Sequence, residues 1–261
     1  MGSVIGLVGS PRKQQGYTHR LVRAVLDGAE ALGARTRLEH LADWDLEACT
    51  ACGRPCFSAG TCQISATAAE LTDVVNEHDA LVIGAPVYVW QVNALTHAFM
   101  DRYRLPDNAS LGRKPNGRAA VPVIVAGGTG TGVFGATRSM LDFLCLWSYR
   151  SLEPVLATRY NLEAAIETAR GRGAELARAA EVSRPFSGVA ELISYYDALR
   201  YGNLGRVDEM LWLARQARHL GYSHGGQIEA LIEEAEAAIA ADPPTAAAKA
   251  VQAFELARGP L

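Results

Sequence analysis

The chain has 261 residues, 49% of them hydrophobic, with 25 Lys and Arg against 28 Asp and Glu and a formal net charge of −3. This composition excludes a disordered or collagen-like chain, and the slightly acidic balance argues against nucleic acid as a partner. The first residues lack the basic start and long apolar core of a signal peptide, and the most apolar stretch, 80–95, is too short and too interrupted to span a membrane. We therefore expect a cytoplasmic protein with no membrane partner.

Short segments rich in Val and Ile alternate with helical patterns over the first two thirds of the chain, which is typical of βαβ units around a parallel sheet. The predicted strands are 4–9, 35–41, 79–84, 121–127 and 152–157. The predicted helices are 19–32, 66–77, 92–103, 134–147 and 161–180. We expect an α/β fold, in which residues 1–181 form a doubly wound, three-layer domain around a five-stranded parallel sheet.

Beyond residue 181 the sequence predicts only helices, with apolar stripes over 189–196, 207–214, 228–239 and 247–254. We expect residues 182–261 to form an all-helical C-terminal segment that serves oligomerisation or covers the ligand site. Because helices this short are marginal alone, their stripes need a partner surface, and we expect a homo-oligomer. The aromatic residues of this segment are expected in a core or subunit interface, with a wall over the ligand as the alternative: Tyr195, Tyr196, Tyr201 and Trp212.

The loop after the first predicted strand contains candidate groups for binding a phosphate. Ser10 and Arg12 follow the strand, and Thr18 stands at the expected start of the next helix. Two hydroxyls, a guanidinium and the N–H groups of a helix N-terminus can converge there on one anion. The alternative is an ordinary surface loop in which Thr18 is only a helix N-cap.

Two further loops follow the third and fourth predicted strands. The first carries aromatic residues in Pro86-Val87-Tyr88-Val89-Trp90, and the second is the glycine-rich 127–132. Ligands of doubly wound proteins bind outside the carboxyl ends of the strands, so both loops are expected beside the phosphate loop. Alternatively, Tyr88 and Trp90 only cap the core.

These segments, Gly9 to Thr18, Gly84 to Tyr88 and the helix containing Phe99-Met100-Asp101-Arg102, together resemble the NAD(P)H-dependent FMN reductase family of flavodoxin-like proteins. The resemblance covers residues 1–180 and implies a flavodoxin-like fold, bound FMN and NAD(P)H as co-substrate. It implies that the FMN phosphate is held by Ser10, Arg12 and Thr18. It also implies ring contacts with Pro86, Val87, Tyr88, Val89, Trp90, Gly127, Gly128 and Thr129.

Four of the five cysteines lie close together, with two, three and five residues between them: Cys49, Cys52, Cys56 and Cys62. In a reducing compartment this clustering favours metal ligation over disulfides, and four thiolates suit a [4Fe–4S] cluster or zinc. The pattern resembles the compact cysteine motif of iron-sulfur flavoproteins, a branch of the same family, but has one additional residue between the second and third cysteines. The resemblance implies a [4Fe–4S] cluster; zinc and unligated or redox-active thiols are the alternatives.

The resemblance implies an FMN-dependent NAD(P)H oxidoreductase of the iron-sulfur flavoprotein type. Electrons would pass from the flavin through the cluster to a small-molecule or redox-protein acceptor that the sequence does not identify. Because the flavin carries the chemistry, no catalytic acid or base is expected. The alternatives are a cluster-free NAD(P)H:FMN or quinone-type reductase and a non-enzymatic electron carrier, although the chain lacks the acidic runs with which carriers commonly steer partners.

Overall fold

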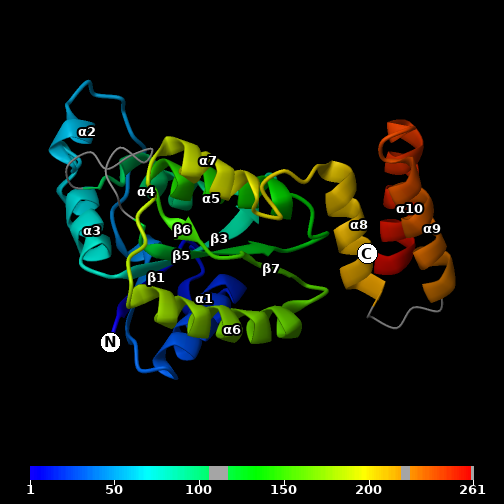
Figure 1. Cartoon of the computed structure of the whole chain (residues 1–261), viewed down its shortest axis with the longest axis horizontal. Helices are drawn as coiled ribbons and strands as arrows, with labels where there is room; N and C mark the ends of the chain where they lie inside the picture. Colours follow the sequence, from blue (N-terminus) through cyan, green and yellow to red (C-terminus); the bar gives the residue numbers. More distant parts are fainter. Residues whose placement is uncertain (106–116, 219–223, 260–261) are drawn as a thin grey trace.

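The computed structural model describes residues 1–105, 117–218 and 224–259 (Figure 1). Its central sheet has parallel strands in the order β2-β1-β3-β5-β6, and β7 also pairs with β5. These parallel strands are β1 (Ser3–Val8), β2 (Arg35–His40), β3 (Ala80–Tyr88), β5 (Ala119–Ala126), β6 (Arg150–Ser151) and β7 (Val155–Thr158). The order places the first strand between the second and third, as in flavodoxin-like proteins, and the predicted fold class is confirmed.

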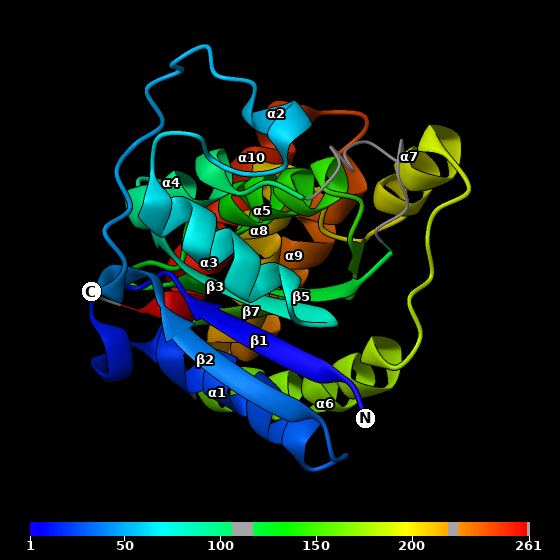
Figure 2. The same cartoon turned by 90° about the vertical axis from the view of Figure 1, so that its left-hand side faces the viewer.

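Helices cover both faces of the sheet (Figure 2). On one face lie α1 (Tyr17–Glu30) and α6 (Leu162–Ala180), and on the other lie α3 (Ala66–Asn76), α4 (Ala94–Arg102) and α5 (Val133–Leu146). Side chains alternate along β1, so that Val4 and Val8 belong to the core under α1 and α6, whereas Ile5 and Leu7 belong to the other core. Burial on both faces explains why β1, β3 and β5 are almost continuously apolar, whereas the edge strand β2 is mostly polar and partly exposed.

Two glycines allow α1 and α6 to pack closely. A Cβ on Gly28 would lie 2.0 Å from the carbonyl oxygen of Arg170, and a Cβ on Gly173 would lie 1.9 Å from that of Val25. Any larger residue at either position would force the two helices apart.

The strand ends differ from the prediction in two places. The predicted strand 152–157 is split into β6 and β7, because Pro154 between them has no N–H to donate to the ladder. In addition, β3 continues beyond the predicted end and turns back into β4 (Gln91–Val92), which pairs with it in antiparallel fashion. The second difference reshapes the aromatic loop.

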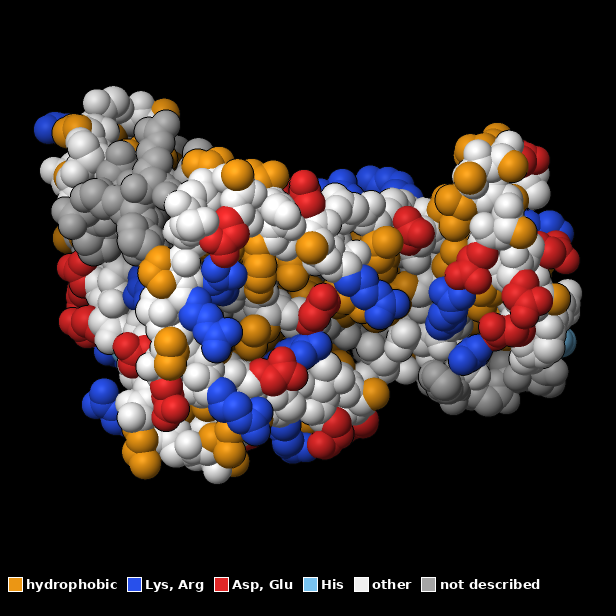
Figure 3. Space-filling model, in the orientation of Figure 1, with side chains coloured by type: hydrophobic (Ala, Val, Ile, Leu, Met, Phe, Trp, Pro, Cys, Tyr) orange, Lys and Arg blue, Asp and Glu red, His pale blue; other side chains and the backbone are white. Residues whose placement is uncertain are grey.

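The C-terminal part contains α7 (Val189–Asp197), α8 (Arg206–Ala217), α9 (Gly225–Ala238) and α10 (Pro243–Arg258). Leu192 and Tyr196 of α7 pack into the core of the α/β part, whereas α8, α9 and α10 enclose a core of their own that also includes Tyr160. Helices α8–α10, which we call the helical module, form a separate lobe (Figure 3). Across the described residues, no helix has the combination of length and apolarity needed to cross a bilayer. The division into domains at residues 181 and 182 stays a prediction.

Candidate functional site

The predicted phosphate loop follows β1 and contains a short 3-10 helix, η1 (Lys13–Gln15), before α1 begins. Ser10 and Thr18 are buried, whereas Arg12 is exposed, and the Ser10 Oγ accepts a hydrogen bond from the Arg12 backbone N–H at 3.3 Å. Among the described residues, no side chain caps the start of α1 at Gly16. The N–H groups of the first helical turn therefore remain available to an anion.

Two buried polar residues that the sequence interpretation missed hold this loop in place. Asn93 Nδ2 donates to the carbonyl oxygen of Gly9 at 2.8 Å, and Thr96 Oγ1 donates to Asn93 Oδ1 at 2.6 Å. A Cβ on Gly9 would lie only 2.0 Å from Thr96 Oγ1, so glycine is required there. The predicted helix 92–103 included Asn93, whereas in the structure α4 begins at Ala94 and Asn93 occupies its N-cap position, with the side chain bonded to the neighbouring loop instead of the helix.

The aromatic loop is a tight hairpin between β3 and β4, with Tyr88 opposite Gln91. Its two central residues, Val89 and Trp90, have positive φ values of 50° and 63°, which is the backbone of a type I′ turn and is costly for a β-branched residue. Val89 is 96% exposed and Trp90 is 48% exposed. Strain combined with exposed apolar groups is typical of ligand-binding loops.

The glycine-rich loop follows β5 and adjoins this hairpin. A Cβ on Gly132 would lie 2.4 Å from the Trp90 Cα, which shows how closely the two loops pack. By contrast, a Cβ on Gly127 or Gly128 would have no described heavy atom within 4 Å. Of the residues predicted to bind the ring, Gly127 and Gly128 therefore border open space, whereas Trp90 packs against Gly132.

Helix α8 reaches this site with two charged residues. Glu209, only 3% exposed, accepts hydrogen bonds from the N–H groups of Gly132 at 3.1 Å and Phe134 at 2.8 Å, and so caps the start of α5. The Arg206 guanidinium lies 4.3 Å from the centre of the Trp90 ring. The helical module is therefore attached to the carboxyl-end loops of the sheet. The sequence interpretation missed both residues because they occupy an ordinary helical pattern far along the chain.

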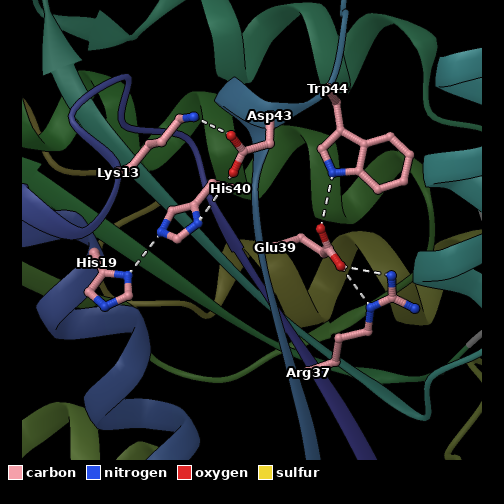
Figure 4. Close-up of polar contacts among 7 residues, drawn as sticks. All are labelled: Lys13, His19, Arg37, Glu39, His40, Asp43 and Trp44. Atoms are coloured by element: carbon pink, nitrogen blue, oxygen red, sulfur yellow. Dashed lines mark hydrogen bonds and ion pairs between the residues drawn. The ribbon is translucent and has the colours of Figure 1, made fainter.

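A chain of polar side chains connects the phosphate loop with the segment that leads to the cysteines (Figure 4). Lys13 pairs with Asp43 of η2 (Leu41–Asp43), and His40 Nδ1 lies 3.7 Å from Asp43 Oδ2. His19 Nδ1 and His40 Nε2 share a hydrogen bond of 3.0 Å, and their rings are stacked. Burial, together with the neighbouring His40 and Arg23, lowers the pKa of His19.

The four clustered cysteines lie in the segment between β2 and α3, which we call the cysteine loop (residues 46–64). Cys49 and Cys52 are exposed, whereas Cys56, at the start of α2 (Cys56–Ala59), and Cys62 are half-buried. Within the described ranges, no three His, Cys, Asp or Glu side chains come close enough to hold a metal ion. The predicted cysteine ligands are thus close in sequence but are not gathered at one point.

Arg102, the last residue of α4, and Arg104, two residues beyond it, contact sulfur atoms of this loop. Arg102 Nη1 donates to Cys62 Sγ at 3.3 Å, and Arg104 Nε donates to Cys56 Sγ at 3.4 Å. Burial opposes ionisation of Cys62, but hydrogen bonds from the Ile64 and Ser65 N–H groups and from Arg102 together lower the pKa of its thiol. The Cys62 thiol is therefore easier to ionise than an ordinary cysteine.

Of the remaining aromatic candidates, Tyr196 is buried, whereas Tyr195, Tyr201 and Trp212 are half-buried and pack against the cores. Tyr195 and Tyr196 donate their hydroxyl groups to the carbonyl oxygens of Ser151 and Tyr149. Cys145 is half-buried, and burial with nearby Asp142 and Asp197 raises the pKa of its thiol to about 11. The hydrogen bonds of Tyr195 and Tyr196 tie these two side chains to the α/β part, as expected for residues that pack in a core.

Comparison with known proteins identifies the family. Residues 3–159 match the family model described as NADPH-dependent FMN reductase. The chain belongs to this family. Curated relatives of this FMN reductase family member include an iron-sulfur flavoprotein of Methanocaldococcus jannaschii, 36% identical over 49% of this chain and 66% of that protein. Another is an iron-sulfur flavoprotein of Archaeoglobus fulgidus, 32% identical over 48% of this chain and 55% of that protein. The matches thus span at most two thirds of these relatives' own length.

Solved structures support the fold assignment. An NAD(P)H:quinone oxidoreductase from Methanothermobacter marburgensis is 17% identical, with a TM-score of 0.52 over 67% of this chain and 96% of that one. A flavone reductase is 17% identical, with a TM-score of 0.51 over 70% and 65% of the two chains. At these identities the similarity concerns the fold alone.

Proposed function

We propose that this FMN reductase family member is an FMN-dependent NAD(P)H oxidoreductase of the iron-sulfur flavoprotein type, passing electrons to a small-molecule or redox-protein acceptor. One observation carries the flavin part of the proposal. The loops after the adjacent strands β1, β3 and β5 meet at one edge of the sheet, beside a helix N-terminus that no described side chain caps. A cytoplasmic setting suits the chain because all five cysteines are unpaired thiols.

The residues at this edge fit FMN. Ser10, Arg12 and Thr18 surround the free start of α1, where a terminal phosphate gains backbone N–H donors and a guanidinium. The open space beside Gly127 and Gly128 leaves room for a flat ring against the exposed hairpin. When bound, FMN supplies the redox chemistry, because it accepts a hydride from NAD(P)H and can release electrons singly. The chain's own residues orient the ring and, through Trp90 and α8, limit access of water.

The donor set of the cysteine loop fits a thiolate-bound group. Cys56 and Cys62 already face cationic N–H donors, and thiolates are the ligands that [4Fe–4S] clusters and structural zinc prefer. Binding four irons would require Cys49 and Cys52, now exposed, to join them. We propose a [4Fe–4S] cluster at these four cysteines.

We call the proposed flavin-binding loops after β1, β3 and β5 the flavin edge. The cysteine loop and the flavin edge lie at opposite ends of the helices between them. Asn93, at the start of α4, contacts the phosphate loop, whereas Arg102, at its end, contacts Cys62. Likewise α5 begins beside Trp90 and ends at Trp147, which stacks on Phe57 of the cysteine loop. At about 1.5 Å per residue these helices are roughly 13 and 21 Å long. We propose a homo-oligomer, in which a second copy can shorten this separation.

The decisive experiment is anaerobic purification, followed by flavin, iron and sulfide analysis and by NAD(P)H oxidation with several acceptors. The proposal expects one FMN and about four irons per chain, with broad visible absorption beyond the flavin bands. Changing Cys52 to Ser should remove that absorption and leave FMN bound, because the flavin loops are separate in sequence. FAD, or no flavin after reconstitution, would contradict the flavin assignment.

A second candidate is a cluster-free flavin or quinone-type reductase, favoured by the absence, in the part of the chain that the structure describes, of three gathered metal ligands. It expects FMN and NAD(P)H oxidation without iron, whereas one zinc per chain would make the loop structural. Bound flavin with no NAD(P)H oxidation would indicate an electron carrier.

A further inference from the structure

Arg102 and Arg104 are buried cations that face the cysteine loop. They are 3% and 7% exposed, and each donates one hydrogen bond to a cysteine sulfur, at 3.3 Å and 3.4 Å. Their other hydrogen bonds within the described residues go to main-chain carbonyl oxygens: Glu47 and Ala48 for Arg102, Asp101 and Tyr103 for Arg104. Neutral carbonyl groups satisfy the N–H donors but do not balance the charge.

Buried guanidinium groups normally have an anionic partner, because an uncompensated charge in the interior is costly. Even the half-buried Arg150 pairs with a carboxylate, that of Glu191, at 2.5 Å. For Arg102 and Arg104, the described residues offer no carboxylate in contact. The groups in contact that could carry a compensating negative charge, as ligands of a bound metal group, are the sulfur atoms of Cys62 and Cys56.

The loop is also docked on these cations. The Arg104 guanidinium lies 4.2 Å from the centre of the Phe57 ring, and Phe57 stacks on Trp147 with ring centres 5.9 Å apart. Arg102 holds the other side of the loop through Glu47 and Ala48. Both ends of the cysteine loop are therefore fixed relative to positive charge.

We propose that Arg102 and Arg104 supply the positive charge that balances a thiolate-bound [4Fe–4S] group on the cysteine loop and raises its reduction potential. The inference rests on the proposed function and deepens it. Each electron that the group accepts from reduced flavin adds one negative charge, and a nearby cation in a poorly solvated site stabilises that added charge. Arginine keeps its proton at all working pH values, so this stabilisation is permanent. Both are positioning residues, since they contact ligands rather than reacting atoms.

The test uses the full chain with FMN, reconstituted without oxygen with ferrous iron and sulfide. Arg102→Gln and Arg104→Gln remove the charge, Arg102→Lys and Arg104→Lys retain it, and Arg54→Gln removes a charge from an exposed residue of the same loop. Iron per FMN and the midpoint potential of the cluster are measured in each. We expect each Gln variant to make reduction at least tenfold less favourable, which is about 59 mV for one electron. The Lys variants should recover most of this change, and Arg54→Gln should stay within about twofold of the parent, because solvent screens its charge.

The possible failures are distinguishable. A parent chain that takes up no iron contradicts the proposed cluster, and this inference with it. A parent with its cluster, but Gln variants that match Arg54→Gln, contradicts the arginine role alone. If a Gln variant loses the cluster but keeps FMN, recovery in the Lys variant supports a role of charge. Equal loss in a folded Lys variant overturns it.

Discussion

Replacing Glu209 by Gln tests whether the helical module is fixed to the flavin edge through one buried carboxylate. The two oxygens accept from the N–H groups of Gly132 and Phe134 at 3.1 Å and 2.8 Å. A glutamine keeps one acceptor and turns its NH₂ group toward the other N–H donor. It therefore loses one charge-assisted hydrogen bond, about 1.5–3 kcal/mol, and the interaction of the charge with the α5 dipole, about 0.5–1 kcal/mol. We expect the free energy of unfolding to fall by about 2–4 kcal/mol.

The assay is urea unfolding followed by tryptophan fluorescence and circular dichroism, with Glu233→Gln as the matched control. Glu233 is exposed on α9, so its replacement should change the free energy of unfolding by less than about 0.5 kcal/mol. Because Glu209 joins α8 to the glycine-rich loop, the variant should also show faster proteolysis between α7 and α8. A change no larger than that of the control would refute the assignment of this carboxylate as the main attachment.

Three further predictions concern single side chains. Arg12→Ala should weaken FMN binding by about 1.5–3 kcal/mol, or roughly 10- to 150-fold in the Kd measured by flavin fluorescence. An unchanged Kd would contradict the assignment of Arg12 to the phosphate site. The folded state lowers the pKa of His19 below its ordinary value of 6.5, so the unfolded state binds the proton more readily. The free energy of unfolding should therefore decline as the pH falls through about 6.5 and below. His19→Gln should flatten this decline in urea titrations, and an identical pH slope would contradict the assignment. In metal-free protein at pH 8, iodoacetamide should modify Cys62, whose pKa is lowered, about tenfold faster than Cys145, whose pKa is raised to about 11. Mass spectrometry that shows the reverse order of modification would contradict the lowered pKa of Cys62.

The sequence by itself determined the α/β layers and predicted which loops form the proposed flavin-binding edge. Alternating and helical apolar patterns are local properties, and they predicted β1, β2, α1 and the helices of the C-terminal part with small errors at the ends. Once the strands were known to be parallel, topology required the loops after β1, β3 and β5 to meet at one edge. The cysteine motif was likewise visible, because its spacing is a property of the chain alone.

Only the tertiary structure decided which distant residues complete these loops. Asn93 holds the phosphate loop, Glu209 caps α5 from a different lobe, and Arg102 faces Cys62, and none of these pairs is close in sequence. Periodicity records which face of an element is buried, but not which polar group it meets there. The tight turn at Val89 and Trp90 also escaped the pattern, because their side chains favour extended backbone and the positive φ angles are imposed by pairing of β3 with β4 and by packing of Trp90 against Gly132. Long-range contacts, which have no local signature in one sequence, therefore decided the detailed shape of the site.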